Sequence, residues 1–427
     1  MPIASDLNKE YKIRDPIYGF IKLDAQEMDI VNSQYFQRLR RIKQLSLTDM
    51  VYPGANHNRF EHSLGVMQMA SDMFDSIVRK EGNLEKLNLK SDDLKRPRKI
   101  LRLAALLHDV GHAPFSHAGE ELMPFRTSSN TTRYTHEDYS IAAIKLLFRE
   151  SIEQHRFGEN HGIKAEDVTA LLGDKTVLPT QTALIWKELI SGQIDADRAD
   201  YLLRDSLHIG VNYGLYDRNM LVNCMTVGES DDASRFLAID EGGWHVAESL
   251  VIARYQMFSQ VYFHPVRRAF DYHIGEVLKR MLVKRRYSNG FFPKPTTAKD
   301  LCKYFELDDW TVFNALKDKK GELHEKIILN RTPYKCIKEW SSEIPEDERI
   351  QAEKDIAQFG GYLDFGAITK WYKLDKDINV YNAKSKTSNL LSCKSKIIEV
   401  MPRLPKTIRL FISTEERGAS NAVVLQP

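Results

Sequence analysis

The sequence predicts a mainly helical protein with a smaller α+β region at its C-terminal end. Apolar residues recur at steps of three and four along several stretches of the first two thirds, which is the spacing of helices that pack one face against a core. From Ile368 onward, four short β-like pieces alternate with Lys, Ser and Asn: KWYKL, INVYN, IIEVM and IRLFIS. The pattern changes at 289–295, so we expect a helical domain over residues 1–288 and an α+β region for oligomer contacts or regulation over 289–427.

Length and composition indicate a globular protein with a sizeable core. The chain has 427 residues, of which 42% are apolar, and its 61 basic residues nearly balance 59 acidic ones. This balance argues against a global field that favours nucleic acid or a membrane. The four cysteines lack the paired spacing of zinc sites and disulfide frameworks, which favours a reducing cytosol. Since the first residues form no apolar signal core and no apolar run reaches roughly 20 residues, we expect a cytoplasmic protein without membrane contact.

The first hundred residues predict a hairpin followed by helices. Tyr11 to Leu23 carries Asp-Pro and Gly between short apolar pieces, which is typical of a small hairpin. A helix is expected over Gln34 to Leu45, with one apolar edge and a basic remainder that is either a solvated face or an anion site where arginines hold phosphates. A second helix with an apolar face is expected from Leu64 to Ile77, and residues 81–99 are expected to form a solvated connection.

A buried helix is predicted at Leu101 to Leu107, which is apolar except for one arginine. His108 and Asp109 stand side by side at its end, and Gly111 and Pro114 follow as helix-ending residues. A buried polar pair without partners would cost several kcal/mol. Neutral imidazole and carboxylate are good ligands for zinc, iron or manganese. The alternative is a pair of core histidines bonded to backbone carbonyls.

Histidines and acids on three other segments extend this pattern. Six of the 13 histidines fall within 80 residues, at His57, His62, His108, His112, His117 and His136. The sequence THED at 135–138 has the spacing of a capping box and opens a helix, where an anion is favoured. On the helix expected over Gln193 to Asp205, either Asp200 and Arg204 form a surface pair or one acid completes a metal site.

The last third predicts fewer regular elements. One long helical pattern with many aromatics runs from Gly243 to Lys284, and a further helix is expected from Ala298 to Lys317. Polar loops are expected between that helix and the β-like pieces. Residues 366–427 carry a net charge of +6, since 11 basic residues face 5 acidic ones, which gives nucleic acid weak support as a partner.

Four separated blocks, NRFEHSLGV, LLHDVGHAPFSH, THE and DADRADYLLRDS, resemble the HD-domain phosphohydrolases when they are taken in this order. They are most similar to the deoxynucleoside triphosphate triphosphohydrolases of the dGTPase-like branch. The resemblance covers about residues 11 to 285. It implies an HD-domain helical core that binds one divalent ion, with manganese, iron, zinc and magnesium as the alternatives.

The resemblance also implies roles for individual residues. The metal ligands would be His62, His108, Asp109 and Asp197. The catalytic and phosphate-contacting histidines would be His112, His117 and His136, and we expect Glu120 to orient His117 and Glu137 to lie beside His136. Phosphates would contact Arg59, Arg198 and Tyr201. The deoxyribose would contact Asp205, Gln44 and Leu45, and the aromatic residue near the base would be Phe270.

The implied reaction is hydrolysis at the α-phosphorus of a deoxynucleoside triphosphate (dNTP), which releases a deoxynucleoside and inorganic triphosphate. The implied assembly is a homo-oligomer, either a dimer or a tetramer. Two other enzyme functions stay open, a metal-dependent nuclease and a phosphatase that acts on another nucleotide. A non-catalytic nucleotide sensor with a structural metal site is a further alternative.

A regulatory nucleotide site is a separate question. In regulated relatives a guanine nucleotide binds through an acid, a glutamine and an arginine on the helix that is here expected to contain Asn32, Gln37 and Arg40. Asn32 replaces the acid that reads guanine. Gln37 and Arg40 are therefore either relics or part of a site for another nucleotide.

Overall fold

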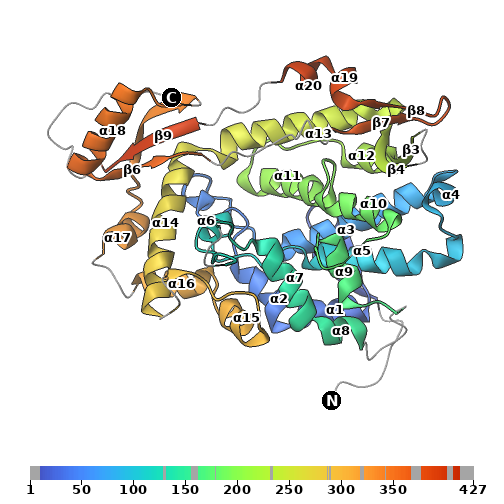
Figure 1. Ribbon diagram of the computed structural model, residues 1–427, viewed down its shortest axis with the longest axis horizontal. Helices are drawn as coiled ribbons and strands as arrows, with labels where there is room; N and C mark the ends of the chain where they lie inside the picture. Colours follow the sequence, from blue (N-terminus) through green and yellow to red (C-terminus); the bar gives the residue numbers. More distant parts are fainter. Residues whose placement is uncertain are drawn as a thin grey trace.

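Helices make up most of the chain, as the sequence predicts, and small sheets lie at its periphery (Figure 1). The computed structural model describes residues 10–413, except 128–130, 155–161, 178, 231–233, 286, 288–289, 318–321, 342, 367–376 and 402–406. Among the described residues, no helix combines the length and apolar character needed to cross a bilayer.

The predicted hairpin is formed by β1 (Tyr11–Asp15) and β2 (Gly19–Leu23), which pair antiparallel. The carboxylate of Asp15 closes its turn by accepting hydrogen bonds from the backbone N–H groups of Ile17 and Tyr18, at 2.8 and 3.0 Å. Gly19 has a φ of +75°, a conformation that glycine adopts at little cost. The side chains of Ile21 and Leu23 on β2 are buried, so the hairpin is anchored in the core.

The helical part follows the hairpin. Its elements are α1 (Ala25–Asn32), α2 (Gln34–Gln37), η1 (Arg38–Arg41), η2 (Thr48–Met50), α3 (Arg59–Arg79), α4 (Asn83–Leu87), η3 (Ser91–Asp93), α5 (Lys95–Leu107), α6 (His117–Glu120), α7 (His136–Leu146), α8 (Arg149–Glu153), α9 (Ala165–Leu171), α10 (Gln181–Ser191), α11 (Ala196–Ile209) and α12 (Arg218–Cys224).

Helices α3, α5 and α11 pack together and form the centre of the fold. Helix α3 begins with a capping box, in which the side chain of Asn58 accepts from backbone N–H groups and the side chain of Glu61 reaches back to the Asn58 backbone. Helix α5 is buried from Ile100 to Leu107. The predicted capping box at Thr135 and Asp138 is confirmed at the start of α7.

The single helix predicted over Gln34 to Leu45 is wrong. The segment divides into α2 and the 3-10 helix η1, and Ile42 leaves the helical conformation because Lys43 forms an antiparallel bridge with Asn58. Its basic side chains are not uniformly solvated either. Arg38 is completely buried and donates to the carbonyl oxygens of Leu307 and His112, at 2.7 and 2.9 Å.

The continuous helix predicted over 243–284 is also interrupted. After β3 (Met225–Glu229), β4 (Arg235–Asp240) and η4 (Glu241–Gly243), the chain forms α13 (Trp244–Met257), a π-helical turn η5 (Phe258–Tyr262) and α14 (Pro265–Lys284). Pro265 lacks a backbone N–H, so α13 cannot run directly into α14. Turns of π-helix are frequent at functional sites, and this one redirects the chain at Tyr262.

The last third contains α15 (Ala298–Phe305), α16 (Asp309–Lys317), α17 (Leu323–Asn330), β5 (Lys335–Ser341), α18 (Glu346–Phe359), β6 (Gly361–Asp364), β7 (Asn379–Asn382), β8 (Thr387–Leu390), α19 (Leu391–Lys394), α20 (Lys396–Val400) and β9 (Thr407–Ile412). The polar loops predicted after Lys317 are therefore wrong. The piece IIEVM is also helical rather than extended, because the side chain of Ser395 caps α20. KWYKL lies outside the described residues.

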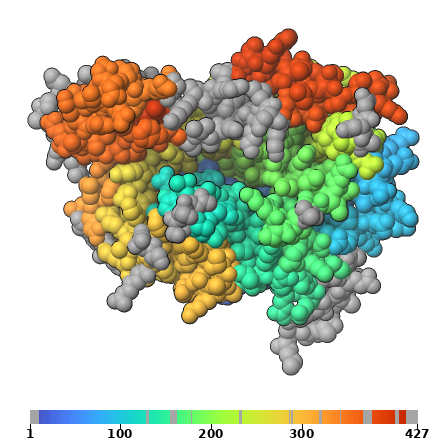
Figure 2. Space-filling model, in the orientation of Figure 1, coloured from blue at the N-terminus to red at the C-terminus, as the bar shows by residue number. Residues whose placement is uncertain are grey.

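The strands of this third join two sheets. β5, β9 and β6 form one antiparallel sheet, whereas β7 pairs parallel with β4 and extends the sheet to the order β3-β4-β7-β8. In Figure 2 the orange and red C-terminal segments lie at the two ends of one edge of the molecule. The largest apolar cluster extends from Ile21 to Ile398, and two smaller clusters lie around Trp340 and around Phe411. The division of the chain at residue 288 stays a prediction.

A pair of histidines, of which His273 is buried, joins α14 to α17. The Nδ1 atoms of His273 and His324 are 2.8 Å apart, and His273 Nε2 accepts from the backbone N–H of Tyr334 at 3.3 Å. Burial, together with the neighbouring His324, lowers the pKa of His273 to about 3. The folded protein keeps His273 neutral where the unfolded chain would bind a proton. This contribution to stability is therefore complete above about pH 6.5 and is lost as the pH falls toward 3.

Lowering the pH from 7.5 to 5.0 should reduce the free energy of unfolding by about 2 kcal/mol through His273. The loss is ~1.4 kcal/mol for each pH unit below 6.5. Urea unfolding of the wild type and of His273→Gln at both pH values measures this difference. His245→Gln, at an exposed histidine, is the matched control and should keep the wild-type pH dependence. An equal pH dependence of His273→Gln and the wild type would contradict the prediction.

Candidate active site

Four side chains from three helices converge where α3, α5 and α11 meet. His62 comes from the first turn of α3, His108 and Asp109 follow the end of α5, and Asp197 lies in the first turn of α11. His62 Nε2 is 3.5 Å from Asp109 Oδ2 and 3.1 Å from Asp197 Oδ1. His108 Nε2 is 3.3 Å from Asp109 Oδ1 and 3.7 Å from Asp197 Oδ1. The structure thus brings together the four residues expected to bind metal.

The chemistry of this donor set fits a divalent ion. His62 Nδ1 bonds Asp200 Oδ2 at 2.8 Å, and His108 Nδ1 bonds the carbonyl oxygen of Ala105 at 2.8 Å. Each imidazole therefore turns its Nε2 toward the carboxylates, and both Nε2 atoms are buried without a hydrogen-bond partner among the described residues. Metal-binding histidines are oriented in this way, by a partner on the other ring nitrogen.

The partner of His62 belongs to a buried charge network. Asp200 and Arg204 are both fully buried and share two hydrogen bonds of 2.9 Å, so the surface pair considered from the sequence is wrong. Arg204 Nη1 also donates to Asp15 of the hairpin at 3.0 Å and lies 3.4 Å from Glu61 Oε2. The network fixes the ring of His62, because buried ions are stable only when they are paired.

The charges around the cluster shift the pKa values of its members. Burial would raise the pKa of Asp109, but Arg59, His108 and His112 hold it well below its usual range, and Arg59 Nη1 bonds Asp109 Oδ2 directly. Burial lowers the pKa of His62, yet the carboxylates of Asp197 and Asp200 raise it to about 10. The carboxylates therefore stabilise positive charge at this centre, whether a proton on His62 or a cation.

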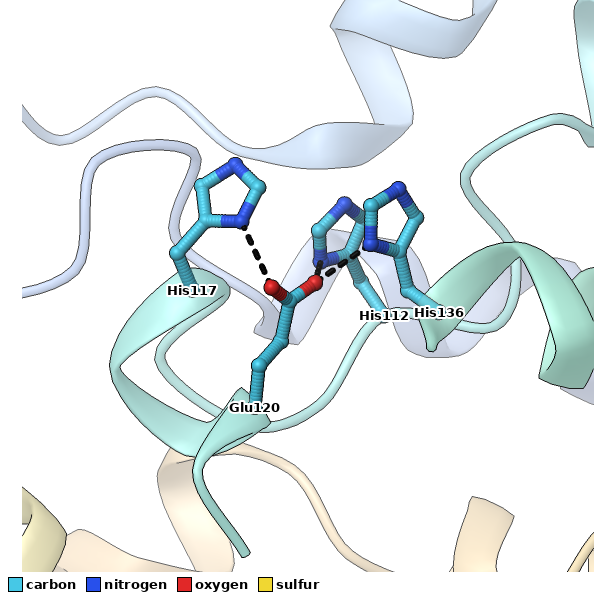
Figure 3. Close-up of side chains that lie close together, drawn as sticks. All are labelled: His112, His117, Glu120 and His136. Carbon is cyan, nitrogen blue, oxygen red and sulfur yellow. Dashed lines mark hydrogen bonds and ion pairs between the residues drawn. The ribbon is translucent and has the colours of Figure 1, made fainter. Parts of the chain in front are cut away.

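A second cluster contains three histidines around one carboxylate, as Figure 3 shows. Glu120 Oε2 is 3.1 Å from His117 Nδ1, and Glu120 Oε1 bonds His136 Nδ1. The ring of His112 stacks on that of His136 with centroids 3.8 Å apart. Glu137 Oε1 lies 3.5 Å from His136 Nε2, as expected from the sequence. The sequence assigned Glu120 to His117 alone, whereas it contacts both His117 and His136.

The second cluster is adjacent to the first, because His112 Nε2 lies 3.4 Å from Asp109 Oδ1. Burial lowers the pKa of His112 well below its usual range, with Arg59 and His136 contributing, so His112 is neutral. Burial also lowers the pKa of His136, but Glu120 raises it to about 9. His136 is therefore protonated at neutral pH and can donate a proton. His117 is the most exposed of the three, with 63% of its side chain accessible.

Cationic side chains lie on the side of Asp197 that faces α13. Arg198 Nη1 donates to Asp195, the N-cap residue of α11, at 2.5 Å. Tyr201 lies one turn further along the same helix. Arg254 of α13 lies near both, and its Nε is buried without a hydrogen-bond partner in the described part of the chain. Arg254 was not predicted as a site residue, because it is one arginine within an aromatic-rich helical pattern that was interpreted as core.

Asp205 lies at the other end of this region, on the third turn of α11. Its Oδ1 is 2.7 Å from His57 Nε2, and its Oδ2 accepts from the hydroxyl of Tyr262 at 2.6 Å. Gln44 joins this group through its backbone N–H, which donates to the His57 carbonyl oxygen at 3.1 Å. The Gln44 Oε1 atom is buried without a partner among the described residues, and Leu45 is also buried.

The aromatic residue that contacts Asp205 is Tyr262. Phe270 is completely buried in the apolar core on α14, whereas the ring of Tyr262 lies 6.1 Å from that of Tyr201. The assignment of Phe270 near the base stays a prediction. Tyr262 lies in the π-helical turn η5 and was not predicted as a site residue.

Asn32, Gln37 and Arg40 do not share one helix. Asn32 ends α1, Gln37 ends α2, and Arg40 lies in η1. Gln37 Nε2 donates to the Val31 carbonyl oxygen at 2.7 Å, and Arg40 Nε donates to Gln37 Oε1 at 2.8 Å. The guanidinium of Arg40 also lies 3.5 Å from the centre of the Phe60 ring. Gln37 and Arg40 thus satisfy each other, and a regulatory nucleotide at this place stays a prediction.

The four residues of the first cluster and the three histidines of the second lie within one matched domain. The HD domain matches residues 59–205, and the HD associated region matches residues 216–359. An uncharacterised protein of Bacillus subtilis is 35% identical over 347 residues, which cover 78% of this chain and 72% of that protein. An uncharacterised protein of Methanocaldococcus jannaschii is 34% identical over 86% of this chain, which spans 63% of its length.

Two further relatives have more informative names. A deoxynucleoside triphosphate triphosphohydrolase SAMHD1 homolog of Dictyostelium discoideum is 28% identical over 95% of this chain and 78% of its own. The crystal structure of a phosphohydrolase from Bacteroides thetaiotaomicron has a TM-score of 0.73 with 25% identity, and the likeness covers 94% of this chain and all of that one. The similarity therefore extends from the helical centre into the C-terminal third.

Proposed function

Since the chain belongs to the HD-domain phosphohydrolase family, we propose that it is a dNTP triphosphohydrolase, which releases a deoxynucleoside and inorganic triphosphate. The observation that carries the proposal is the meeting of two clusters at Asp109. One cluster suits a divalent ion, and the other suits proton transfer. The Dictyostelium relative bears the name of this activity, which supports the choice of substrate.

His62, His108, Asp109 and Asp197 would hold the ion, which HD domains bind as a divalent metal. A divalent ion supplies Lewis acidity, which makes water more acidic and polarises phosphoryl oxygens. Arg59 donates to Asp109 and to the hydroxyl of Ser116 at 2.8 Å, so its guanidinium is fixed at the edge of the metal ligands. It is placed to neutralise charge on the phosphate that is attacked.

The second cluster would move protons. His136 carries a proton at neutral pH and stacks on His112, which lies next to Asp109. His117 is exposed and can contact a bound substrate. Imidazoles suit this task because their ordinary pKa lies near neutrality. The shared Glu120 fixes the orientation of both rings, and it stabilises the charged form of whichever ring holds the proton.

Arg198, Tyr201 and Arg254 would bind the outgoing triphosphate, since they lie together near Asp197. Asp205 would accept the 3′-hydroxyl of the sugar in place of one of its present donors. Gln44 and Leu45 would pack under the sugar and leave no space for a 2′-hydroxyl. Tyr262 would then contribute its hydroxyl beside the sugar.

We expect Arg254→Ala to raise the KM for a dNTP more than it lowers kcat, because a charge-assisted contact to the non-reacting phosphates is lost. One such contact contributes about 1.5–3 kcal/mol, which is about ten- to a hundredfold in affinity. Steady-state kinetics with each of the four dNTPs measures the effect. Arg235→Ala is the control, since this arginine lies on β4 and pairs with Glu229. An unchanged KM for Arg254→Ala would exclude Arg254 from the phosphate site.

The proposed function is tested by product analysis. Purified protein with a measured metal content is incubated with each dNTP, and the products are separated by anion-exchange chromatography. Equal amounts of deoxynucleoside and triphosphate are expected. Release of monophosphate and pyrophosphate, or cleavage of single-stranded DNA without dNTP turnover, would replace the proposal with another phosphohydrolase. Size-exclusion chromatography with light scattering tests the predicted homo-oligomer.

A further inference from the structure

We propose that Asp309, which lies in the C-terminal third of the chain, is a positioning residue for the loop that carries Ser116 and His117. Its carboxylate holds that loop in a strained conformation from outside the HD domain. The inference assigns a function in catalysis to a residue more than 180 positions away in sequence. Its kinetic consequences rest on the proposed function, whereas the restraint of the loop by Asp309 can be measured without turnover.

The loop before α6 contains two consecutive residues with positive φ angles. Phe115 has a φ of 58° and Ser116 a φ of 55°, and neither is glycine. Side chains other than glycine rarely adopt this region, and such strain persists only where the surrounding structure enforces it. His117 follows immediately and begins α6. The direction of the His117 side chain therefore depends on whatever holds Phe115 and Ser116 in place.

Asp309 supplies that restraint through both of its carboxylate oxygens. Its Oδ1 accepts from the backbone N–H of Phe115 at 2.7 Å, and its Oδ2 accepts from the backbone N–H of Lys43 at 2.8 Å. Ser116 Oγ donates to the Lys43 carbonyl oxygen at 2.6 Å. Asp309, Lys43, Ser116 and Phe115 thus form a closed hydrogen-bonded circuit. Asp309 is only 1% exposed, so water does not compete for these contacts.

The same circuit reaches the residues that would contact substrate. Ser116 Oγ accepts from Arg59 Nε at 2.8 Å, and Arg59 bonds Asp109. The circuit therefore orients Arg59 on one side and His117 on the other. Asp309 itself touches neither cluster through any described contact. It acts through the backbone of Phe115 and Lys43, which makes it a positioning residue rather than a catalytic one.

The neighbours of Asp309 in sequence hold the earlier part of the loop. The hydroxyl of Tyr304 donates to the Gly111 carbonyl oxygen at 2.8 Å, and Arg38 links the carbonyl oxygens of Leu307 and His112. Tyr304 and Arg38 thus hold the loop through the carbonyl oxygens of Gly111 and His112. Asp309 instead accepts from the backbone N–H at the strained position, that of Phe115. Its second oxygen accepts from the backbone N–H of Lys43 at the same time.

A carboxylate suits this position better than an amide. Burial raises the pKa of Asp309 to about 7 against the two backbone N–H groups, so both oxygens are free to accept above that pH, where the variants are compared. Asparagine has one acceptor oxygen and one N–H₂ group, so Asp309→Asn can satisfy only one of the two backbone N–H groups and turns a donor toward the other. Asp308→Asn is a matched control in the same turn. Asp308 accepts from the backbone N–H of Thr311 at 2.8 Å and pairs with Arg41, so it serves the start of α16 and not the loop.

The test combines kinetics with amide hydrogen exchange on the full chain. Asp309→Asn should lower kcat for a dNTP about a hundredfold, because small displacements of a catalytic group have effects of that size. KM and metal content should stay near wild type, and exchange should accelerate in the peptide containing residues 111–118. Asp308→Asn should match the wild type in kcat and in that peptide. Wild-type kcat or unchanged loop exchange in Asp309→Asn would overturn the inference.

A measurement on the wild type decides the matter if Asp309→Asn does not fold. The backbone N–H groups of Phe115 and Lys43 should exchange slowly in the unmodified protein. Rapid exchange of either group would contradict the restraint by Asp309. Failure of the proposed function is recognised separately. A wild-type protein that leaves all four dNTPs intact would refute that function, while the exchange experiment would still report on Asp309.

Discussion

Replacing Asp109 with alanine should abolish metal binding and dNTP turnover together. Asp109 is the only described residue whose carboxylate lies within 3.5 Å of His62, His108 and His112, so it joins the metal ligands to the proton-transfer cluster. Loss of a single positioned donor at a reacting oxygen already costs about 10²–10³ in rate. Loss of a ligand that holds the Lewis acid should cost at least that, and we expect residual activity below about one thousandth.

Elemental analysis of the purified variant, together with the product assay, measures both effects. Asp75→Ala is the matched control, because Asp75 also lies in the helical centre, on α3, but bonds Arg98 at 2.7 and 2.8 Å, away from the metal ligands. It should retain both metal and activity. Full metal content and wild-type turnover in Asp109→Ala would remove the basis of the proposed function. His108→Ala should behave in the same way as Asp109→Ala.

The candidate metal centre could be predicted in part from local signals, and the resemblance to the HD-domain phosphohydrolases supplied the choice of Asp197. His62 follows a helix cap, His108 and Asp109 end a buried helix, and Asp197 follows the N-cap residue Asp195. Each segment has its own capping or periodicity pattern, and the order of the four blocks links them. The packing of α3 against α5 and α11 then brings the four side chains together, as a core of apolar faces requires.

The residues that were missed depend on contacts between distant segments. Asp309 meets Phe115 across 194 positions, and Tyr262 meets Asp205 only because a π-helical turn shifts it out of regular spacing. Neither contact has a periodic signal. The same reason explains the errors after Lys317. The strand β9 is last in the described chain, yet it lies between β5 and β6. Such non-local pairing is set by packing rather than by local sequence.

Replacing Glu120 with glutamine should separate proton transfer from metal binding. Glutamine keeps the shape of the side chain and offers one acceptor oxygen, but it turns an N–H₂ group toward either His117 or His136. One imidazole must then change its tautomer or its orientation. General acid–base catalysis contributes about 10²–10⁴ in rate, so kcat should fall within that range while the metal content stays unchanged.

The pH dependence of kcat should also change in Glu120→Gln. In the wild type the pKa of His136 is about 9, because the carboxylate of Glu120 outweighs the effect of burial. The proton on His136 is therefore present below about pH 9 and is lost above it. Without the negative charge the pKa of His136 falls, so the alkaline limb of the kcat profile should move to lower pH in Glu120→Gln. Glu137→Gln makes the same change on the other side of the ring, where Glu137 is 54% exposed and 3.5 Å away, and should shift the limb little. A Glu120→Gln variant with wild-type kcat and an unmoved alkaline limb would show that the shared carboxylate does not orient the proton-transfer pair.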